Sequence, residues 1–284
     1  MHRILVIGGT GTVGRQVVTQ LLEKGTAVRV LARKPESARF PGQVDQVRAD
    51  LTAPETLDSA LSGIDACFLV WTAPPATVSA ALQRIARSIR RVVFLSAPIK
   101  TPHPLFQQPN PLRSITEQIE AAIQSSAAEW TFLRPGMFAA NSLLWWAPQI
   151  RAGLPVRWPY LSVPTAPIDE RDIASVAVKA LTENGHHRAE YVLTGPDSLT
   201  QFEQISAIAR VIGRDLQVQE LSSLEASREI LTAFPRSAVK MLLDAWAAAA
   251  GQPALVASTF ADLMQRPPRT FLDWAGDNAS QFIA

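Results

Sequence analysis

The stretch from residue 3 to residue 22 joins a strand pattern to a helix pattern through a run of glycines. Residues 3–7 (RILVI) are apolar and rich in β-branched side chains, which is typical of a buried parallel strand. Gly8, Gly11 and Gly14 then follow the pattern G-x-x-G-x-x-G. Apolar side chains recur at helical spacing after them, at Val13, Val17, Leu21 and Leu22. The chain is therefore expected to pass from a strand into a helix through a turn that side chains would obstruct.

This turn has the properties of a phosphate-binding loop. The first glycine allows a tight turn, the second lets the backbone approach a pyrophosphate, and the third lets the helix pack closely on the strand. Free N–H groups and the positive end of the helix dipole then favour the phosphates. A tight turn that binds no ligand is the alternative, but a strand before the glycines and a helix after them favour a dinucleotide site.

The first half of the chain alternates strand and helix patterns. Strands are predicted at residues 27–31, 43–48, 65–70, 91–95 and 129–134, and helices at 54–62, 75–88 and 110–125, the last with Asn110 as cap and Pro111 in its first turn. This alternation predicts an α/β fold, a Rossmann-type doubly wound parallel sheet. We expect residues 1–158 to form the NAD(P)-binding Rossmann domain. Residues 159–284 are expected to complete the core and to form a smaller C-terminal substrate lobe.

Composition excludes several other classes of protein. The 284 residues are 47% hydrophobic, which is enough for a full core, but no run is long and apolar enough to span a bilayer and no signal peptide precedes the first strand. A net charge of +2 is too small to imply nucleic acid. The single Cys67 excludes an intrachain disulfide and fits a reducing, cytoplasmic location. The four histidines show no metal-ligand spacing, so we expect no metal and a monomer or homodimer acting on a small molecule.

Residues that follow the strands lie where doubly wound sheets bind ligands. Arg33 and Lys34 follow the second strand, where an NAD site usually has an acid, and two cations instead favour the 2′-phosphate of NADP. Solvated loop cations are the alternative. Asp50 and Leu51 follow the third strand and border the adenine in this fold, although Asp50 is also a good residue for a helix start.

The fourth and fifth strands are followed by further candidates. Trp71, Thr72 and Ala73 are expected against the cofactor, with Trp71 either a pocket wall or a core residue. Ser96 lies where a hydroxyl would reach substrate or nicotinamide. Lys100 stands four residues later, but Pro98 argues against a helix between them. The proline-rich residues 101–111 are predicted to be a loop over the site, with Phe106 as a lid residue.

Several later motifs carry a family resemblance. Residues 133–138 (LRPGMF) with Asn141, residues 168–174 (IDERDIA) and residues 193–196 (LTGP) resemble the atypical short-chain dehydrogenases, and within them the NmrA-like group. Residues 94–113 are similar to bacterial relatives of the ergot-alkaloid reductases. The resemblance covers nearly the whole chain.

The resemblance implies a Rossmann core that binds NADP and a small C-terminal lobe over the nicotinamide end. By it, Arg33 holds the 2′-phosphate. The pyrophosphate is held by Gly8, Thr10, Gly11, Thr12, Val13 and Gly14. The nicotinamide and substrate are lined by Pro135, Gly136, Met137 and Phe138.

The chain departs from the family's usual proton donor, Tyr-x-x-x-Lys. Tyr160 and Tyr191 are followed four residues later by Pro164 and Gly195. Glu117 is of interest because the NmrA-like group often has an acid there, but its capping-box spacing from Ser114 is the favoured interpretation. Weak catalytic candidates are therefore Ser96, Lys100 and Glu117. Hydride transfer without a strong protein acid suits an iminium or an activated double bond.

The second half of the chain is rich in aromatic residues that suit an apolar pocket. The predicted substrate residues are Trp71, Phe106, Phe138, Asn141, Trp145, Trp146 and Tyr160, although core packing is an equal alternative for each tryptophan. The predicted function is an NADP-dependent reductase of an apolar or aromatic small molecule (iminium, activated C=C or ketone), in natural-product biosynthesis. A non-catalytic NADP-sensing regulatory protein and a non-redox isomerase or cyclase on the same scaffold are the alternatives.

Overall fold

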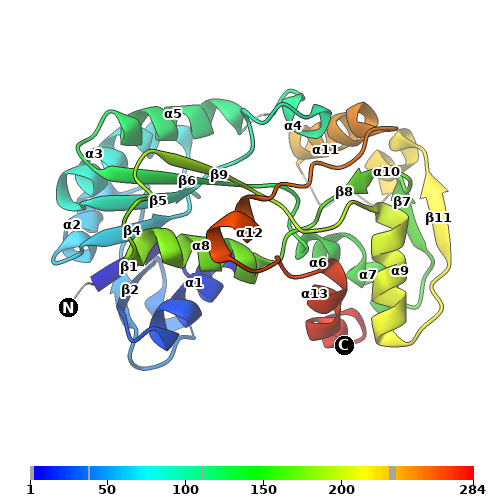
Figure 1. Ribbon diagram of the computed structural model, residues 1–284, viewed down its shortest axis with the longest axis horizontal. Helices are drawn as coiled ribbons and strands as arrows, with labels where there is room; N and C mark the ends of the chain where they lie inside the picture. The colour runs from blue at the N-terminus through cyan, green and yellow to red at the C-terminus, as the bar shows by residue number, and fades with distance from the viewer. Residues whose placement is uncertain (1–2, 38, 111, 230–234) are drawn as a thin grey trace. The chain divides into compact units, whose positions relative to one another are not determined.

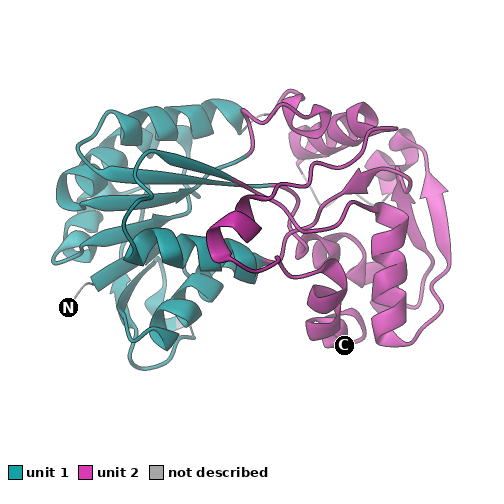
Figure 2. Ribbon diagram, viewed as in Figure 1, with its two compact units in different colours: residues 1–97, 112–135, 170–191 teal, residues 98–111, 136–169, 192–284 magenta. Residues whose placement is uncertain are grey.

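The computed structural model describes residues 3–37, 39–110, 112–229 and 235–284. The chain forms two units that interleave along the sequence (Figure 2). Unit 1 comprises residues 1–97, 112–135 and 170–191, and unit 2 comprises residues 98–111, 136–169 and 192–284. The sequence-based division at residue 158 is contiguous and therefore does not coincide with these units.

Unit 1 is built on a seven-stranded sheet with the order β3-β2-β1-β4-β5-β6-β9 (Figure 1). Neighbouring strands from β3 to β6 run parallel. This is the predicted doubly wound sheet. Its strands are β1 (Arg3–Ile7), β2 (Ala27–Ala32), β3 (Asp45–Arg48), β4 (Ala66–Leu69), β5 (Arg91–Leu95), β6 (Glu129–Pro135) and β9 (Ala189–Leu193).

Helices cover both faces of this sheet. The helices are α1 (Thr12–Glu23), α2 (Leu57–Leu61), α3 (Val78–Ser88), α5 (Arg113–Gln124) and α8 (Glu170–Thr182). α1 packs on α8, whereas α3 packs on α2 and α5 (Figure 1). Strand β9 and helix α8 come from the second half of the chain, which therefore completes the core of the first.

Several predicted helices are shorter than their sequence patterns. Two begin as 3-10 turns with a proline at the first position, Pro54–Thr56 before α2 and Pro75–Thr77 before α3. The helix predicted from Asn110 begins at Arg113, with Leu112 rather than Asn110 at its N-cap position and no side-chain cap. The predicted role of Pro111 lies outside the described residues.

Unit 2 consists of helices of four to fourteen residues and two small sheets. Strands β7 (Val156–Pro159) and β11 (Val218–Leu221) pair in parallel, and β8 (Pro164–Thr165) and β10 (Leu199–Thr200) pair antiparallel. Its helices are α4 (Pro104–Gln107), α6 (Asn141–Trp145), α7 (Ala147–Arg151), α9 (Gln201–Ile212), α10 (Ser223–Glu229), α11 (Arg236–Ala249), α12 (Thr259–Met264) and α13 (Phe271–Asp277). No helix among the described residues is long and apolar enough to cross a membrane.

Tryptophans form the centre of the core of unit 2. Trp146, Trp158 and Trp246 are almost fully buried, with ring centroids 6.0 Å apart for Trp146 and Trp158 and 5.7 Å apart for Trp158 and Trp246. Both pairs are edge-to-face, the arrangement that aromatic quadrupoles favour. The indole of Trp158 donates a 2.6 Å hydrogen bond to Gln201, so its polar atom is satisfied.

Candidate functional site

The glycine turn has the predicted geometry. Gly8 follows β1 with a φ of 84°, a backbone conformation that favours glycine, and its carbonyl accepts the N–H of Gly11 at 3.0 Å. A Cβ atom added to Gly14 would lie 2.2 Å from the Gly8 oxygen, so no side chain fits where α1 meets the turn. The close approach of Gly14 to the Gly8 carbonyl therefore lets the helix pack directly against the turn that follows the strand.

The start of α1 suits a pyrophosphate. Thr10, Gly11 and Thr12 are exposed, whereas the side chain of Val13 is buried in the core. Gly11 is the N-cap and supplies no side-chain hydrogen bond to the first turn. The backbone N–H groups there are therefore available to an anion, and the helix dipole favours one. The residues present fit the dinucleotide pyrophosphate.

Polar residues follow β2 and β3 as the sequence predicts. Arg33 and Lys34 are both exposed, and Arg33 forms no ion pair with any residue that the structure describes. The carboxylate of Asp50 accepts the N–H of Thr52 at 2.8 Å, and the backbone N–H of Asp50 donates to the hydroxyl of Thr56. Asp50 thus organises the turn before α2, which was the alternative to its adenine role. The neighbouring Leu51 is buried.

Trp71 packs on unit 1 at the end of β4. Its ring is half-buried beside the hydrophobic core, and its indole N–H donates to the carbonyl of Ala73 at 2.7 Å. Thr72 is exposed between them. The hydrogen bond from the Trp71 indole to Ala73 therefore holds this segment in a turn at the surface of unit 1.

A buried charge network lies beyond β5 and β6. The Ser96 hydroxyl donates to Glu120 at 2.5 Å, and Arg134 forms a 2.9 Å ion pair with the same carboxylate. Both charged side chains are only 2% exposed. Arg134 also donates to the carbonyl of Ala97 at 3.0 Å and pairs with Glu190 at 2.9 Å. The Ser96 hydroxyl therefore donates its hydrogen bond to the buried carboxylate of Glu120, whose charge is balanced by Arg134.

Glu120 was not predicted from the sequence, although a signal for it exists. Helix α5 buries Thr116, Ile119 and Ile123, and Glu120 lies on that same face. An acid within an apolar helical stripe requires a partner, because an unpaired buried charge is costly. Here that partner is Arg134, which comes from a strand and cannot be found from the spacing within the helix.

Glu117 does not form the capping box that its spacing from Ser114 predicted. The capping-box interpretation is wrong, because α5 begins at Arg113 and Ser114 therefore lies within the first turn rather than at the N-cap. The side chain of Glu117 is half exposed and lies 3.7 Å from Arg113, an i,i+4 ion pair. Lys100 is also exposed, and the segment from Ser96 to Lys100 contains no helix, as Pro98 indicated.

The two tyrosines are engaged in hydrogen bonds with other residues. The Tyr191 hydroxyl lies 2.7 Å from Nδ1 of His186, and burial raises the pKa of Tyr191 while burial lowers the pKa of His186. Tyr160 shares a 2.7 Å hydrogen bond with Ser223. A raised pKa makes Tyr191 a weaker proton donor than an ordinary phenol.

Unit 2 brings predicted residues together around Gly136. The N–H of Gly136 donates to the carbonyl of Leu193 at 2.9 Å, and a Cβ on Gly136 would lie 3.5 Å from the ring of Phe106. Phe106 lies on α4, a one-turn helix, so residues 101–111 are not wholly a loop. Phe138 and Ile168 form a parallel bridge, and Asn141 begins α6. Phe106 therefore covers the backbone that follows Pro135.

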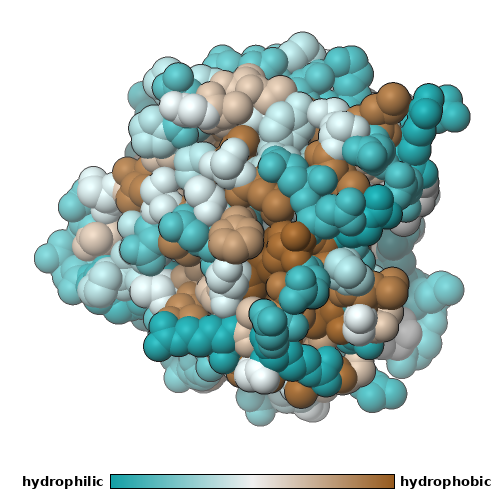
Figure 3. All heavy atoms as spheres, turned by 90° about the vertical axis from the view of Figure 1, so that its right-hand side faces the viewer, coloured by the Kyte–Doolittle hydropathy of each residue, from teal (hydrophilic) through white to brown (hydrophobic). Residues whose placement is uncertain are grey.

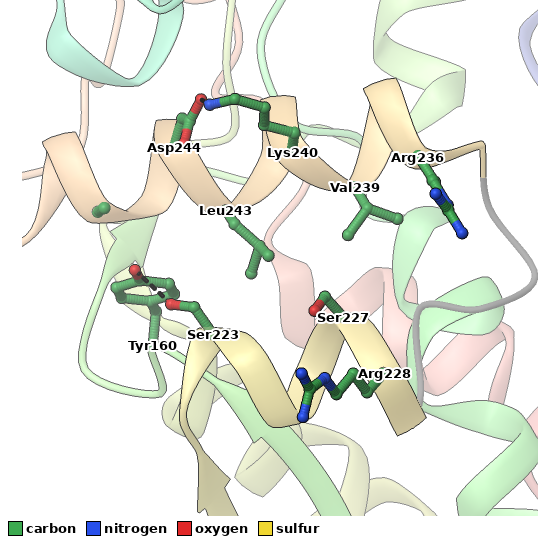
Figure 4. A pocket seen from close by; sticks show the side chains of 10 residues that line it. Tyr160, Ser223, Ser227, Arg228, Arg236, Val239, Lys240, Leu243 and Asp244 are labelled. Carbon is green, nitrogen blue, oxygen red and sulfur yellow. Dashed lines mark hydrogen bonds and ion pairs between the residues drawn. The ribbon is translucent and has the colours of Figure 1, made fainter.

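A pocket of about 720 Å³ lies in unit 2 between α10 and α11 (Figure 4). Tyr160, one of the predicted substrate residues, is among the residues that line it. Trp145 is half-buried, but Trp146 is fully buried in the core and not on a pocket wall. The side of unit 2 drawn in Figure 3 has hydrophobic side chains gathered in a hollowed area with hydrophilic ones around it. Among the described residues, no group of His, Cys, Asp or Glu side chains is arranged to hold a metal ion.

Comparisons with known proteins point in one direction. A family model described as NAD(P)H-binding matches residues 8–184. A (4-alkanoyl-5-oxo-2,5-dihydrofuran-3-yl)methyl phosphate reductase from Streptomyces griseus is 37% identical over 286 residues, covering 98% of this chain and 99% of that protein. An NAD(P)H azoreductase from Xenophilus azovorans is 33% identical over 290 residues and covers 99% of each chain. The structure of an NADPH-dependent quinone oxidoreductase from Escherichia coli with NADPH has a TM-score of 0.78 at 19% identity, covering 96% of this chain and 99% of that one.

Proposed function

The chain belongs to the NAD(P)H-binding family, as an NADP-dependent reductase of the atypical short-chain type, and from that premise we propose that it transfers hydride to an apolar small molecule. The observation that carries this proposal is the glycine turn, in which Gly8 has a positive φ and Gly14 leaves no space for a side chain. In that geometry the backbone can approach a pyrophosphate at the start of α1.

Arg33 favours the binding of NADPH over that of NADH. A guanidinium binds a phosphate with two parallel hydrogen bonds, and Arg33 follows β2, the position that faces the ribose 2′ substituent in this fold. Its exposure and the absence of an ion pair among the described residues leave its charge available. NADPH supplies the hydride, and the protein binds and orients the reactants and excludes water from them.

Among the described residues, the hydroxyl groups considered as proton donors are already engaged, and this supports the choice of acceptor. The Ser96 hydroxyl already donates to Glu120, and Tyr191 is held by His186. An acceptor whose carbon is already electron-poor needs little protonation during hydride transfer, which favours an iminium or an activated C=C over a plain ketone. The relatives named as reductases of a dihydrofuranone ester and of azo compounds support an electron-poor π bond as the acceptor.

Calorimetric titration with NADPH and NADH tests the cofactor assignment. Arg33→Ala should weaken NADPH binding ten- to a hundredfold, about 1.4–2.8 kcal/mol, and leave NADH binding unchanged, because the lost hydrogen bonds are made to the 2′-phosphate. Arg87→Ala removes another exposed arginine of unit 1 and should alter neither affinity. Equal affinities for the two cofactors in the unaltered chain would contradict the role of Arg33.

Loss of NADPH absorbance with a panel of butenolide, iminium, quinone and ketone acceptors then tests hydride transfer. Consumption of NADPH with the electron-poor acceptors supports the proposal. Tight NADPH binding with no consumption by any acceptor would contradict it and favour a cofactor-sensing protein. Turnover of an acceptor to an isomer with no NADPH consumed would favour an isomerase.

A further inference from the structure

We propose that the pocket between α10 and α11 binds a phosphate monoester carried on an apolar body. The proposal adds a substrate class to the proposed reductase function, and it rests on that function because the ligand is taken to be the substrate. The pocket volume of about 720 Å³ lies within the range of small-molecule sites. All the residues used below belong to unit 2.

One wall of the pocket is apolar. Val239, Leu243 and Ala247 recur every four residues along α11, so that they share one face of the helix. Figure 4 shows Val239 and Leu243 pointing from α11 into the space above α10. A hydrocarbon chain or flat ring placed there would be removed from water along its length, which favours binding.

The charged residues around this wall favour an anion. Lys240 pairs with Asp244 at 2.6 Å, so these two charges compensate each other. Arg228 of α10 and Arg236 of α11 also line the pocket, and neither forms an ion pair with a residue in the described part of the chain. The lining therefore carries two positive charges without an ion-pair partner in the described part of the chain, and a guanidinium suits a phosphate because it donates paired hydrogen bonds to it.

Hydroxyl groups complete the polar part of the lining. Ser227 lies on α10 beside Arg228, and Tyr160 and Ser223 form a 2.7 Å hydrogen-bonded pair on the other side of the pocket from Arg236 (Figure 4). The ligand thus meets hydroxyls and guanidinium groups around one apolar stripe. This combination selects an amphiphilic anion over either a neutral lipid or inorganic phosphate.

The backbone that presents Tyr160 is strained. Its φ is 55°, a left-handed conformation that is unfavourable for a residue other than glycine. The strain is held by the carbonyl of Tyr160, which accepts the amide of the buried Gln201 at 2.9 Å and the N–H of Val163 at 3.0 Å. Strain maintained in this way is typical of binding sites and points to Tyr160 as a placed residue of the pocket.

Calorimetric titration of the full chain with octyl phosphate, below its micelle concentration, tests the proposal. Octyl phosphate should bind, whereas octanol and inorganic phosphate should each bind at least tenfold more weakly. Arg228→Gln and Arg236→Gln should each weaken octyl phosphate binding about tenfold or more, and Leu243→Ala should weaken it through the lost apolar contact. Arg214→Gln removes an exposed arginine of the same unit outside the pocket and should have no effect.

NADPH affinity, measured in parallel on every variant, separates the two proposals. If the unaltered chain binds NADPH but not octyl phosphate, the pocket assignment alone is overturned. If it binds octyl phosphate but not NADPH, the reductase function alone is overturned. Octyl phosphate affinities of Arg228→Gln and Arg236→Gln that both equal that of the unaltered chain would also overturn the phosphate site. Binding to phosphatidic acid vesicles without binding to soluble octyl phosphate would assign the arginines to a membrane surface instead and overturn the proposal.

Discussion

At the scale of single residues, burial separates two acids on the same helix. Glu120 of α5 is 2% exposed and paired with Arg134, whereas Glu117 is half exposed and pairs loosely with Arg113. Three residues of separation place one carboxylate in the core and the other at the surface. Their chemical identity is the same, so any difference in their effect on stability comes from their surroundings.

Glu120→Gln should therefore destabilise the protein by about 3 kcal/mol, because it leaves the Arg134 guanidinium buried without its main counter-charge. Glu117→Gln is the matched control and should change the free energy of unfolding by less than about 0.5 kcal/mol. Urea denaturation of both variants measures this difference. Similar small effects at both positions would show that the network of Ser96, Glu120 and Arg134 contributes little.

At the scale of elements, the turn between β1 and α1 depends on one close contact. Gly14→Ala would place a methyl group against the Gly8 carbonyl, so the helix must move away from the turn. We expect a loss of about 3 kcal/mol of stability and at least a tenfold loss of NADPH affinity. Gly42→Ala, in the same unit and with open space around it, should change neither by a measurable amount.

Calorimetry and thermal unfolding of the two glycine variants provide the measurement. If Gly14→Ala retained full NADPH affinity, then the turn would not be the pyrophosphate site. That result would also remove the main structural support for the cofactor position, whatever the stability of the variant.

At the scale of the whole molecule, cofactor binding should be visible as added stability. NADPH at one hundred times its dissociation constant should raise the free energy of unfolding of the unit that binds it by about 2.7 kcal/mol, since only the folded state binds the cofactor. Hydrogen exchange should slow at residues 8–14 of unit 1. Both changes should be smaller in Gly14→Ala at the same NADPH concentration, because its affinity is weaker, and protection confined to unit 2 would contradict the assignment.

Local patterns predicted most of unit 1 correctly. The strand of residues 3–7, the glycine turn and the following helix were all found, because apolar spacing and glycine content report conformation over short distances. Helix starts were less accurate: Asn110 does not cap α5, since the chain turns into the helix only at Arg113. Predictions for the cofactor contacts, including Arg33 and Asp50, rest on position in the fold and remain to be tested by binding.

The amino-acid sequence by itself indicated the parallel sheet, the glycine turn and the family, since each is recognised from patterns of residues close in the chain. Tertiary structure alone decided that Glu120 rather than Glu117 is buried, that residues 170–191 return to complete unit 1, and that Arg228 and Arg236 line one pocket. Each of these outcomes pairs segments that lie far apart in sequence or on separate elements. The spacing of residues within one element does not encode which distant partner compensates a charge or closes a cavity.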